Sequence, residues 1–325
     1  MKKVFSLILL VLVFQLVHCE IFSFPVDNPR VSANFGEFRG TGNRGPHFHM
    51  GMDFSTGLRS GVPIYAVERG WLVRIEVDED DIYGYVVVLE HENGYRTVYA
   101  HLSNFSPKVQ SIVDSIKQEF GNTRVVVKFP EREVWFEKRE VVGFSGTTGE
   151  APVPHAHLEV RDKREEYSYN PSKFLNLPKP TDQNIVLEKI KIGDNVYDFY
   201  EGGIYTYSGL FPQLSLKTYS RGFNNTLGLN RISLFLEDSE IYRLSFEEIS
   251  WQEFTNVWAV YDKASVSEAY KFELWYKLFP EGSSSLVKVN RFPDVGRFPD
   301  YAKYRVVLED VWGMKREFSF YLRRR

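Results

Sequence analysis

Two short segments, far apart in the sequence, hold residue types suited to binding a metal ion. The first begins at His47 and ends at Asp53, and the second is His155-Ala156-His157. Together they contain four of the seven histidines. A catalytic zinc site takes three ligands from histidine and carboxylate side chains and leaves a fourth position for water. These residue types therefore predict a catalytic zinc site.

The spacing in the second segment has a mechanical reason. In a β-strand, residues i and i+2 point to the same side, so His155 and His157 can face one metal ion together. One can bind the ion while the other acts on a bound water molecule. Taken alone, a His–Asp pair four residues apart is usually a coincidence of the surface or of a helix cap. Because both segments occur in one chain, a metal site is the favoured interpretation.

Residues 1–19 have the pattern of an export signal. Lys2 and Lys3 precede an almost wholly apolar stretch at 4–17, which is short for a membrane span. The only cysteine, Cys19, ends this segment and leaves two interpretations open. Either Cys19 is lipidated, which would be the chain's membrane attachment, or it precedes a simple cleavage site. We expect an exported protein of the periplasm, the outer-membrane surface or the extracellular cell envelope.

The composition is that of a globular protein with much β-structure. The chain has 325 residues, with 43 % hydrophobic and 26 % charged residues. Aromatic residues make up 16 %, which favours pleated, half-buried surfaces. The net charge is −3, and the only basic tract is the final Arg323-Arg324-Arg325. Nothing in this pattern indicates a nucleic-acid partner.

Residues 22–100 read as short strands, with Asn93-Gly94 as a hairpin turn. A helix is expected over residues 106–120, because Ser106 can cap it, Pro107 suits its first turn and Gly121 suits its end. Its apolar residues recur on one face and predict packing on a sheet; they are Val109, Ile112, Val113, Ile116 and Phe120.

The sequence divides at a proline-containing stretch near residue 180. We expect a signal peptide at 1–19, a first domain at 22–177, a linker at 178–184 and a second domain at 185–325. The second domain contains no histidine or cysteine. Its alternating apolar residues predict about seven short strands and a β-sandwich.

Residues 30–175 resemble the lysostaphin-type (LytM-like) zinc endopeptidases, which cut peptide bonds in bacterial peptidoglycan. The resemblance lies in ordered segments: Asn34-Phe35-Gly36-Glu37, residues 49–54, residues 61–66, Tyr99-Ala100-His101-Leu102, residues 146–149 with 154–161, and Asn170-Pro171. It implies a mainly β fold in which an antiparallel sheet forms a groove, with an inserted helix. In a subset of the family an immunoglobulin-like β-sandwich follows, which agrees with the strand pattern.

The resemblance also implies roles for five residues. His49, Asp53 and His157 would bind one Zn²⁺ per chain, and His101 and His155 would be catalytic. A zinc-activated water would attack the peptide carbonyl while a neutral imidazole accepts its proton. Which of His101 and His155 is the general base stays open.

The implied partner is a peptidoglycan peptide. A cell-wall or envelope protein could bind through the C-terminal domain. The main alternative function is a non-catalytic relative that activates a cell-wall amidase. Such relatives typically lose ligands, whereas this chain keeps all three.

Other residues have two interpretations. His47 either supports the site or packs near it, and His91 is expected to be solvated. Glu159 and Arg161, on the strand face of the histidines, either line the groove or form an ion pair. The tryptophans of the second domain either stack on sugars or fill its core, which is favoured; they include Trp251, Trp258 and Trp275. Some family members have a tyrosine shortly before the first ligand, and residues 43–48 contain none.

Overall fold

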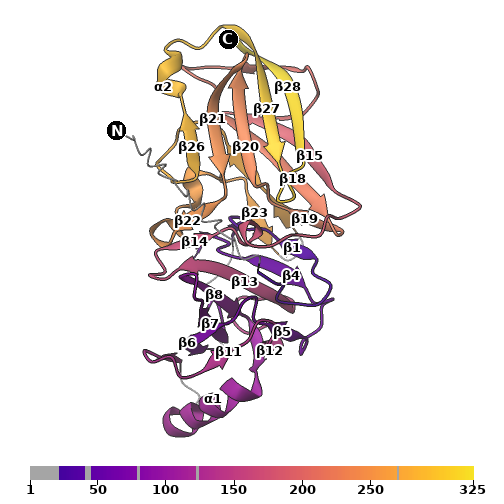
Figure 1. Ribbon diagram of the computed structural model, residues 1–325. Coiled ribbons are helices and arrows are strands. Elements are labelled where there is room, and N and C mark those ends of the chain that lie inside the picture. Colours follow the sequence, from indigo (N-terminus) through magenta and orange to yellow (C-terminus); the bar gives the residue numbers. More distant parts are fainter. Residues whose placement is uncertain (1–21, 41–44, 79–80, 122–123, 269–270) are drawn as a thin grey trace, which may run out of the picture.

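The computed structural model describes residues 22–40, 45–78, 81–121, 124–268 and 271–325. The expected signal peptide and Cys19 lie outside the described residues. Within the described ranges, no helix is long and apolar enough to cross a membrane. Figure 1 shows the earlier strands, in indigo to magenta, below the later strands, in orange to yellow.

The fold is mainly β, as the sequence predicts, and its described strand pairs are antiparallel except for the parallel pair of β17 with β28. The largest sheet has the order β1-β4-β13-β8-β7-β6-β10. Its strands are β1 (Val31–Ala33), β4 (Met52–Ser55), β13 (His155–Asp162), β8 (Tyr95–Ala100), β7 (Val86–Glu90), β6 (Gly70–Val77) and β10 (Val125–Lys128). Three short strands pair with it, namely β11 (Trp135–Phe136), β14 (Tyr167–Tyr169) and β22 (Glu248–Ser250).

A smaller sheet and a helix cover one face of this sheet. The smaller sheet has the order β5-β12-β9, with β5 (Pro63–Tyr65), β12 (Val141–Ser145) and β9 (Leu102–Phe105). Helix α1 (Pro107–Phe120) follows β9 and buries Val109 and Val113. The expected helix is thus confirmed, but Phe120 is 59 % exposed, so the apolar stripe does not stay buried to its end. Ser106 precedes the helix without a side-chain capping bond to any described residue.

Alternation along β13 separates the core from the opposite face of the sheet. Ala156, Leu158 and Val160 enter the core shared with α1 and the smaller sheet. His155, His157, Glu159 and Arg161 therefore point to the other face. On that face Arg161 lies against Trp251, which comes from the later part of the chain.

The predicted hairpin joins β7 to β8, but the expectation for His91 beside its turn is wrong. His91 is 2 % exposed. Its Nδ1 lies 2.8 Å from the Arg69 carbonyl oxygen, and its Nε2 lies 2.8 Å from the Thr97 hydroxyl. Both ring nitrogens thus have protein partners, which replace the expected water.

Two sheets form the predicted sandwich. One has the order β16-β15-β18-β19 with β25 beside β18, and the other is β17-β28-β27-β20-β21-β26. The first contains β15 (Asn184–Ile192), β16 (Asn195–Asp198), β18 (Leu214–Gly222), β19 (Asn225–Leu227) and β25 (Trp275–Lys277). The second contains β17 (Ile204–Tyr207), β20 (Arg231–Leu236), β21 (Ser239–Ser245), β26 (Val287–Asn290), β27 (Tyr301–Glu309) and β28 (Lys315–Arg324).

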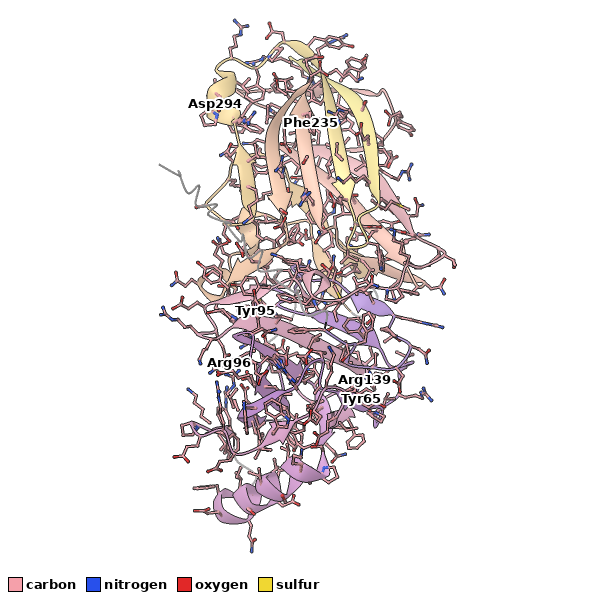
Figure 2. All side chains as sticks on the ribbon, in the orientation of Figure 1. Tyr65, Tyr95, Arg96, Arg139, Phe235 and Asp294 are labelled. Carbon is pink, nitrogen blue, oxygen red and sulfur yellow. The ribbon has the colours of Figure 1, made fainter. Side chains whose placement is uncertain are left out.

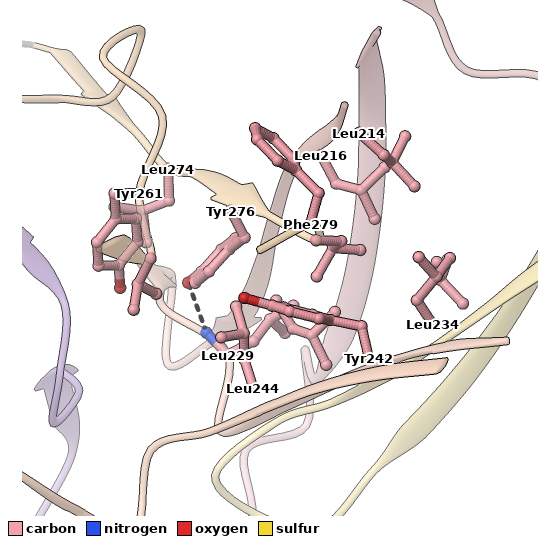
Figure 3. Packing of buried hydrophobic residues seen from close by; sticks show 14 of the residues in the cluster. Leu214, Leu216, Leu229, Leu234, Tyr242, Leu244, Tyr261, Leu274, Tyr276 and Phe279 are labelled. Carbon is pink, nitrogen blue, oxygen red and sulfur yellow. Dashed lines mark hydrogen bonds between the residues drawn. The ribbon is translucent and has the colours of Figure 1, made fainter. Parts of the chain in front are cut away.

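The two sandwich sheets have five and six strands, more than the alternation pattern predicted. Short edge strands such as β16 and β19 are too brief to show alternation in the sequence. Leucine and aromatic side chains from both sheets fill the space between them, and the Tyr276 hydroxyl accepts the Leu229 N–H at 3.0 Å (Figure 3). Whether the sandwich is immunoglobulin-like stays a prediction.

Short elements complete the described chain. They are β2 (Phe38–Arg39), β3 (His47–Phe48), β23 (Val266–Glu268), β24 (Lys271–Glu273), α2 (Phe292–Val295) and the single-turn helices η1 (Pro171–Lys173), η2 (Trp251–Glu253) and η3 (Val257–Ala259).

The two bodies share buried side chains. Phe35, Phe38, Phe48 and Met50 belong to the same buried cluster as the sandwich core. In the other direction, Trp312 joins the core beneath the large sheet. Strand β22, which belongs to the C-terminal region, pairs with β14. A linker at residues 178–184 therefore stays a prediction. The parts of the chain before and after it pack against each other through these buried side chains.

Candidate metal centre

Strand pairing brings the predicted ligands together. In the β4–β13 pair, Asp53 lies directly opposite His157, and His49 precedes β4 by three residues. The Asp53 Oδ1 atom is 3.1 Å from His49 Nε2 and 2.9 Å from His157 Nδ1. The two imidazole nitrogens are 3.2 Å apart. Tetrahedral zinc, with bonds of about 2.0–2.2 Å, spaces its donors by roughly 3.3–3.5 Å. The group is thus spaced nearly as metal ligands are.

Each ring is oriented by its other nitrogen. His49 Nδ1 donates to the Asn34 carbonyl at 2.8 Å, and His157 Nε2 donates to Glu159 Oε1 at 3.2 Å. Such bonds fix the imidazole tautomer and leave the opposite nitrogen for a metal. His49 Nε2 and His157 Nδ1 therefore both face Asp53.

The charges in this group fit a cation. Burial opposes charge on His157, but hydrogen bonds to Asp53 and Glu159 raise its pKa to about 9. Burial also opposes ionisation of Asp53, yet His49 and His155 hold the pKa of its carboxyl well below the usual range. The metal-free group thus holds a proton between its donors, and a metal ion would take the place of that proton.

Gly51 allows His157 to approach. A Cβ atom at this position would lie 2.7 Å from His157 Nε2 and 2.6 Å from the Leu158 carbonyl oxygen. Both distances are shorter than real Cβ contacts, so a larger residue would displace the ring or the strand. Only glycine fits at position 51, between His49 and Asp53, without moving His157 or its strand.

The two predicted catalytic histidines lie beside this group. The ring centroids of His101 and His155 are 5.0 Å apart. His101 Nδ1 donates to the Thr148 carbonyl at 3.0 Å, and His155 Nδ1 donates to the Val153 carbonyl at 2.8 Å. With Nδ1 of each ring bonded to a carbonyl, Nε2 is the nitrogen left for other partners, and His155 Nε2 is 3.5 Å from Asp53 Oδ1. Burial, reinforced by the neighbouring histidines, lowers the pKa of His101 well below its usual value.

The backbone around His101 is unusual. His101 has φ = 59°, a left-handed conformation that is uncommon outside glycine. It stands between β8 in the large sheet and β9 in the small one, so this turn carries the chain from one sheet to the other. The strain marks a position where the chain's direction and the histidine side chain are both fixed.

The glycine-rich turn supplies the partner of His101. Gly149 has φ = 70°, and a Cβ there would lie 2.5 Å from the backbone nitrogen of Gly84. The turn therefore packs closely on residues 81–84. The Thr148 hydroxyl accepts the Tyr85 N–H at 2.9 Å and donates to the Leu102 carbonyl at 2.8 Å. These contacts hold the Thr148 carbonyl toward His101.

Glu159 and Arg161 form the ion pair that was one interpretation of the sequence. The Arg161 Nε atom donates to Glu159 Oε2 at 2.6 Å. Although burial opposes it, Arg161 and His157 lower the pKa of Glu159 to about 2. Glu159 also supports His157, a role that the sequence interpretation missed. The signal was present, because Glu159 follows His157 by two residues and shares its strand face.

His47 takes the packing interpretation. It is 6 % exposed, its Nδ1 bonds the Gly45 carbonyl at 2.8 Å, and its ring stacks on Phe254 at 4.8 Å. Trp275 is 5 % exposed in the sandwich, and Trp258 packs on Phe38. Trp275 thus follows the favoured core interpretation, whereas Trp251 and Trp258 are partly buried and pack against the edge of that core.

A tyrosine from another element lies at the site. The centroid of the Tyr83 ring is 5.9 Å from that of the His157 ring. It is 6.5 Å from that of the His101 ring, to which it lies nearly parallel. Burial and the hydrogen-bonded Glu159 raise the pKa of Tyr83 well above its usual value. Sequence reasoning looked for a tyrosine only before His49 and missed this one, which loop packing brings in.

Residues 47–124 match the family model described as peptidase family M23. This stretch of the chain is similar to peptidase family M23. The match includes His49, Asp53 and His101, three of the five residues with expected roles. The sequence resemblance to the lysostaphin-type enzymes is therefore confirmed.

Curated relatives are similar to part of this chain. A DD-carboxypeptidase/endopeptidase named Mpg from Neisseria meningitidis is 34 % identical over 111 residues, which cover 32 % of this chain and 20 % of the relative. The same values hold for Mpg from Neisseria gonorrhoeae. The chain thus spans about a fifth of the length of the relatives it matches.

Solved structures with partial similarity include two peptidases. A zinc-containing peptidase from Vibrio cholerae has a TM-score of 0.32 and 24 % identity, over 49 % of this chain and 41 % of that one. The catalytic domain of lysostaphin from Staphylococcus simulans has a TM-score of 0.33 and 20 % identity, and the match covers 46 % of this chain and 94 % of that one.

Proposed function

We propose that this chain is an exported zinc endopeptidase that hydrolyses peptide bonds in bacterial peptidoglycan. The observation that carries the proposal is the pair of histidines beside the converging ligand group. Both rings bond a carbonyl through Nδ1, which leaves Nε2 of each available beside the group formed by His49, Asp53 and His157. The M23 domain makes peptidoglycan the expected substrate class.

In this proposal His49, Asp53 and His157 hold one Zn²⁺, and their donor atoms all lie within 4.8 Å of one another. Bound zinc supplies Lewis-acid chemistry by lowering the pKa of water and polarising a carbonyl. His101 stays neutral because burial lowers its pKa, so its Nε2 can accept a proton at neutral pH. His155 lies 3.5 Å from Asp53 and shares proton transfer and stabilisation of the developing oxyanion.

The relative's name suggests which bonds to test first. Mpg is named a DD-carboxypeptidase/endopeptidase, so we propose that this chain also cuts peptide bonds between D-configured centres. Both a crosslinked dimer of peptidoglycan stem peptides and a pentapeptide stem are suitable substrates. Cleavage of the dimer alone would define an endopeptidase, and loss of a terminal residue would add carboxypeptidase activity.

The test compares single-histidine variants of residues 20–325. Zinc per chain and amines released from peptidoglycan are measured for the parent, His155→Ala and His101→Ala. We expect one zinc in all three and turnover only in the parent, reduced at least about 100-fold in the variants. His91→Gln is the matched control, since His91 is buried away from the ligand group, and it should keep both zinc and turnover.

The same experiment separates the enzyme from the amidase activator. A parent chain that binds zinc and releases no amine from any peptidoglycan type would contradict the hydrolase. Stimulation of a separately added amidase by that chain would then identify the activator.

A further inference from the structure

The C-terminal sandwich contacts the groups that orient two of the candidate metal ligands. This feature lies outside the M23 match and has two separate parts. One reaches His49 through the turn at residues 34–37, and the other reaches His157 through Arg161. Their shared origin in the sandwich indicates a role for that body in the metal centre.

The first part holds the turn that binds His49. The backbone of His49 pairs with this turn, because Gly36 N–H donates to the His49 carbonyl at 2.7 Å and His49 N–H donates to the Glu37 carbonyl at 2.8 Å. The His49 ring bonds the carbonyl of Asn34, a residue with no exposed surface. Backbone and ring of this ligand therefore both depend on the turn.

The sandwich binds that turn through polar groups. Glu37 Oε1 accepts the N–H groups of Asn34 at 2.8 Å and of Gly228, in the sandwich, at 2.7 Å. The Asn34 side chain donates to the Gly228 carbonyl at 3.2 Å. The Tyr261 hydroxyl donates to the Gly36 carbonyl at 2.8 Å. Buried hydrogen bonds of this kind are costly to break, because each leaves an unsatisfied partner.

The second part approaches from the other side. Arg161, which pairs with Glu159, has its guanidinium 4.2 Å above the ring of Trp251. Trp251 stacks on Phe254, whose carbonyl accepts the Phe48 N–H at 2.9 Å. A guanidinium held on the face of a half-buried indole gains cation–π attraction and loses freedom. Trp251 thus limits where Arg161, and through it Glu159, can lie.

Arg161 has a further carboxylate partner. Its Nη1 donates to Glu165 at 2.8 Å, and Glu165 also accepts from Arg96 at 2.9 Å. Arg96 is labelled in Figure 2, on the lower body of the molecule. The indole face and two carboxylates therefore hold the guanidinium in one place beside Glu159.

We propose that the sandwich is a positioning element of the metal centre, acting on His49 through Glu37 and Tyr261 and on His157 through Trp251. The inference rests on the proposed zinc site and extends it to a body otherwise regarded as accessory. Loss of groups that orient metal ligands typically costs 10–100-fold in metal affinity. The predicted role is thus measurable in zinc binding itself, without reference to turnover.

The test measures zinc dissociation constants of full-length variants by competition with a chromophoric chelator. We expect Trp251→Leu to weaken zinc binding about tenfold and to lower kcat more than it changes KM. Trp275→Leu is the matched control, because Trp275 is a buried sandwich tryptophan whose backbone partners, Lys217 and Ser265, lie within the C-terminal part of the chain. It should lower the Tm and leave zinc affinity unchanged.

Two further variants keep the test decisive if Trp251→Leu fails to fold. Tyr261→Phe removes only the hydroxyl and should weaken zinc about fivefold. Glu37→Ala should weaken zinc binding more than Tyr261→Phe does. Glu37→Gln should bind zinc nearly as tightly as the parent, because its amide oxygen can still accept the N–H groups of Asn34 and Gly228. Folded variants that bind zinc as tightly as the parent would overturn the inference.

The outcomes also separate this inference from the proposed activity. A parent that binds zinc without hydrolysing peptidoglycan contradicts the endopeptidase, while the zinc affinities still decide the positioning role. A parent that binds no zinc overturns both.

Discussion

His157 Nδ1 lies 2.9 Å from the Asp53 carboxylate that faces it across the β4–β13 pair. This contact joins the two sequence segments and places one donor from each beside His49. Because the register is fixed by the hydrophobic alternation of β13, a slip by one residue would turn the histidines into the core. The metal centre therefore depends on strand register as well as on its ligands.

Asp53→Asn tests the charge of the ligand group. The amide keeps the size of the side chain but loses the negative charge that faces both histidines, so zinc affinity should fall by more than about 100-fold. Chelator competition measures it. Asp262→Asn is the control, since Asp262 is a buried carboxylate paired with Lys191 in the sandwich. Equal losses in both variants would contradict a specific role for Asp53.

Gly51→Ala tests the close approach of His157. The added methyl group would lie within 2.7 Å of the ring, so we expect zinc affinity to drop about tenfold or more. Gly94→Ala supplies the comparison, because Gly94 has φ = 86° and no described atom within 4 Å of an added Cβ. It should cost stability through backbone strain alone and leave zinc binding intact.

The metal-free chain should lose stability in mild alkali. The folded-state pKa of His157 is raised from 6.5 to about 9, so its protonated form stabilises the fold fully below pH 6.5. That contribution disappears as the pH rises through about 9 and amounts to at most about 3 kcal/mol. Urea unfolding in the presence of a chelator, from pH 6 to pH 9.5, measures it. A curve without this decline, or one unchanged in His157→Gln, would contradict the assignment.

Zinc binding should show the opposite trend with pH. Because the metal displaces the proton on His157, apparent affinity should rise about tenfold per pH unit up to about pH 9. Calorimetry in buffers of different ionisation enthalpy should detect about one proton released per zinc at pH 7.5. Binding without proton release would show that His157 is not a ligand.

Residues 22–177 alone should not fold stably. Four side chains of this part, Phe35, Phe38, Phe48 and Met50, are buried against the sandwich. Exposing them costs about 1.5–3 kcal/mol each, a sum similar to the whole stability of a typical domain. Circular dichroism and thermal unfolding of the truncated chain measure this directly. A cooperative transition near that of the full chain would contradict the interlocked packing.

Much of this structure was predictable from local sequence. Residue types and spacing indicated the ligand group, since the i, i+2 rule places His155 and His157 together without further information. Helix α1 followed from Pro107, Gly121 and its apolar stripe, and the hairpin followed from Asn93-Gly94.

Other features depend on contacts that no local pattern records. Asn34 supports His49 through a backbone carbonyl, so its side-chain type gives no signal of that bond. Trp251 meets Arg161 only after the sandwich has packed, and His91 is buried because Arg69 and Thr97 satisfy both ring nitrogens. The sequence showed the chemistry of the ligands, whereas the groups that orient them came from tertiary packing.

The most direct test of the proposed function is cleavage of a purified crosslinked stem-peptide dimer by residues 20–325 loaded with zinc. Mass spectrometry follows the products, and a chelated sample and His155→Ala serve as controls. The account predicts two monomer fragments whose masses sum to the dimer plus one water, formed only by the zinc-loaded parent. An intact dimer with one zinc bound per chain would contradict it.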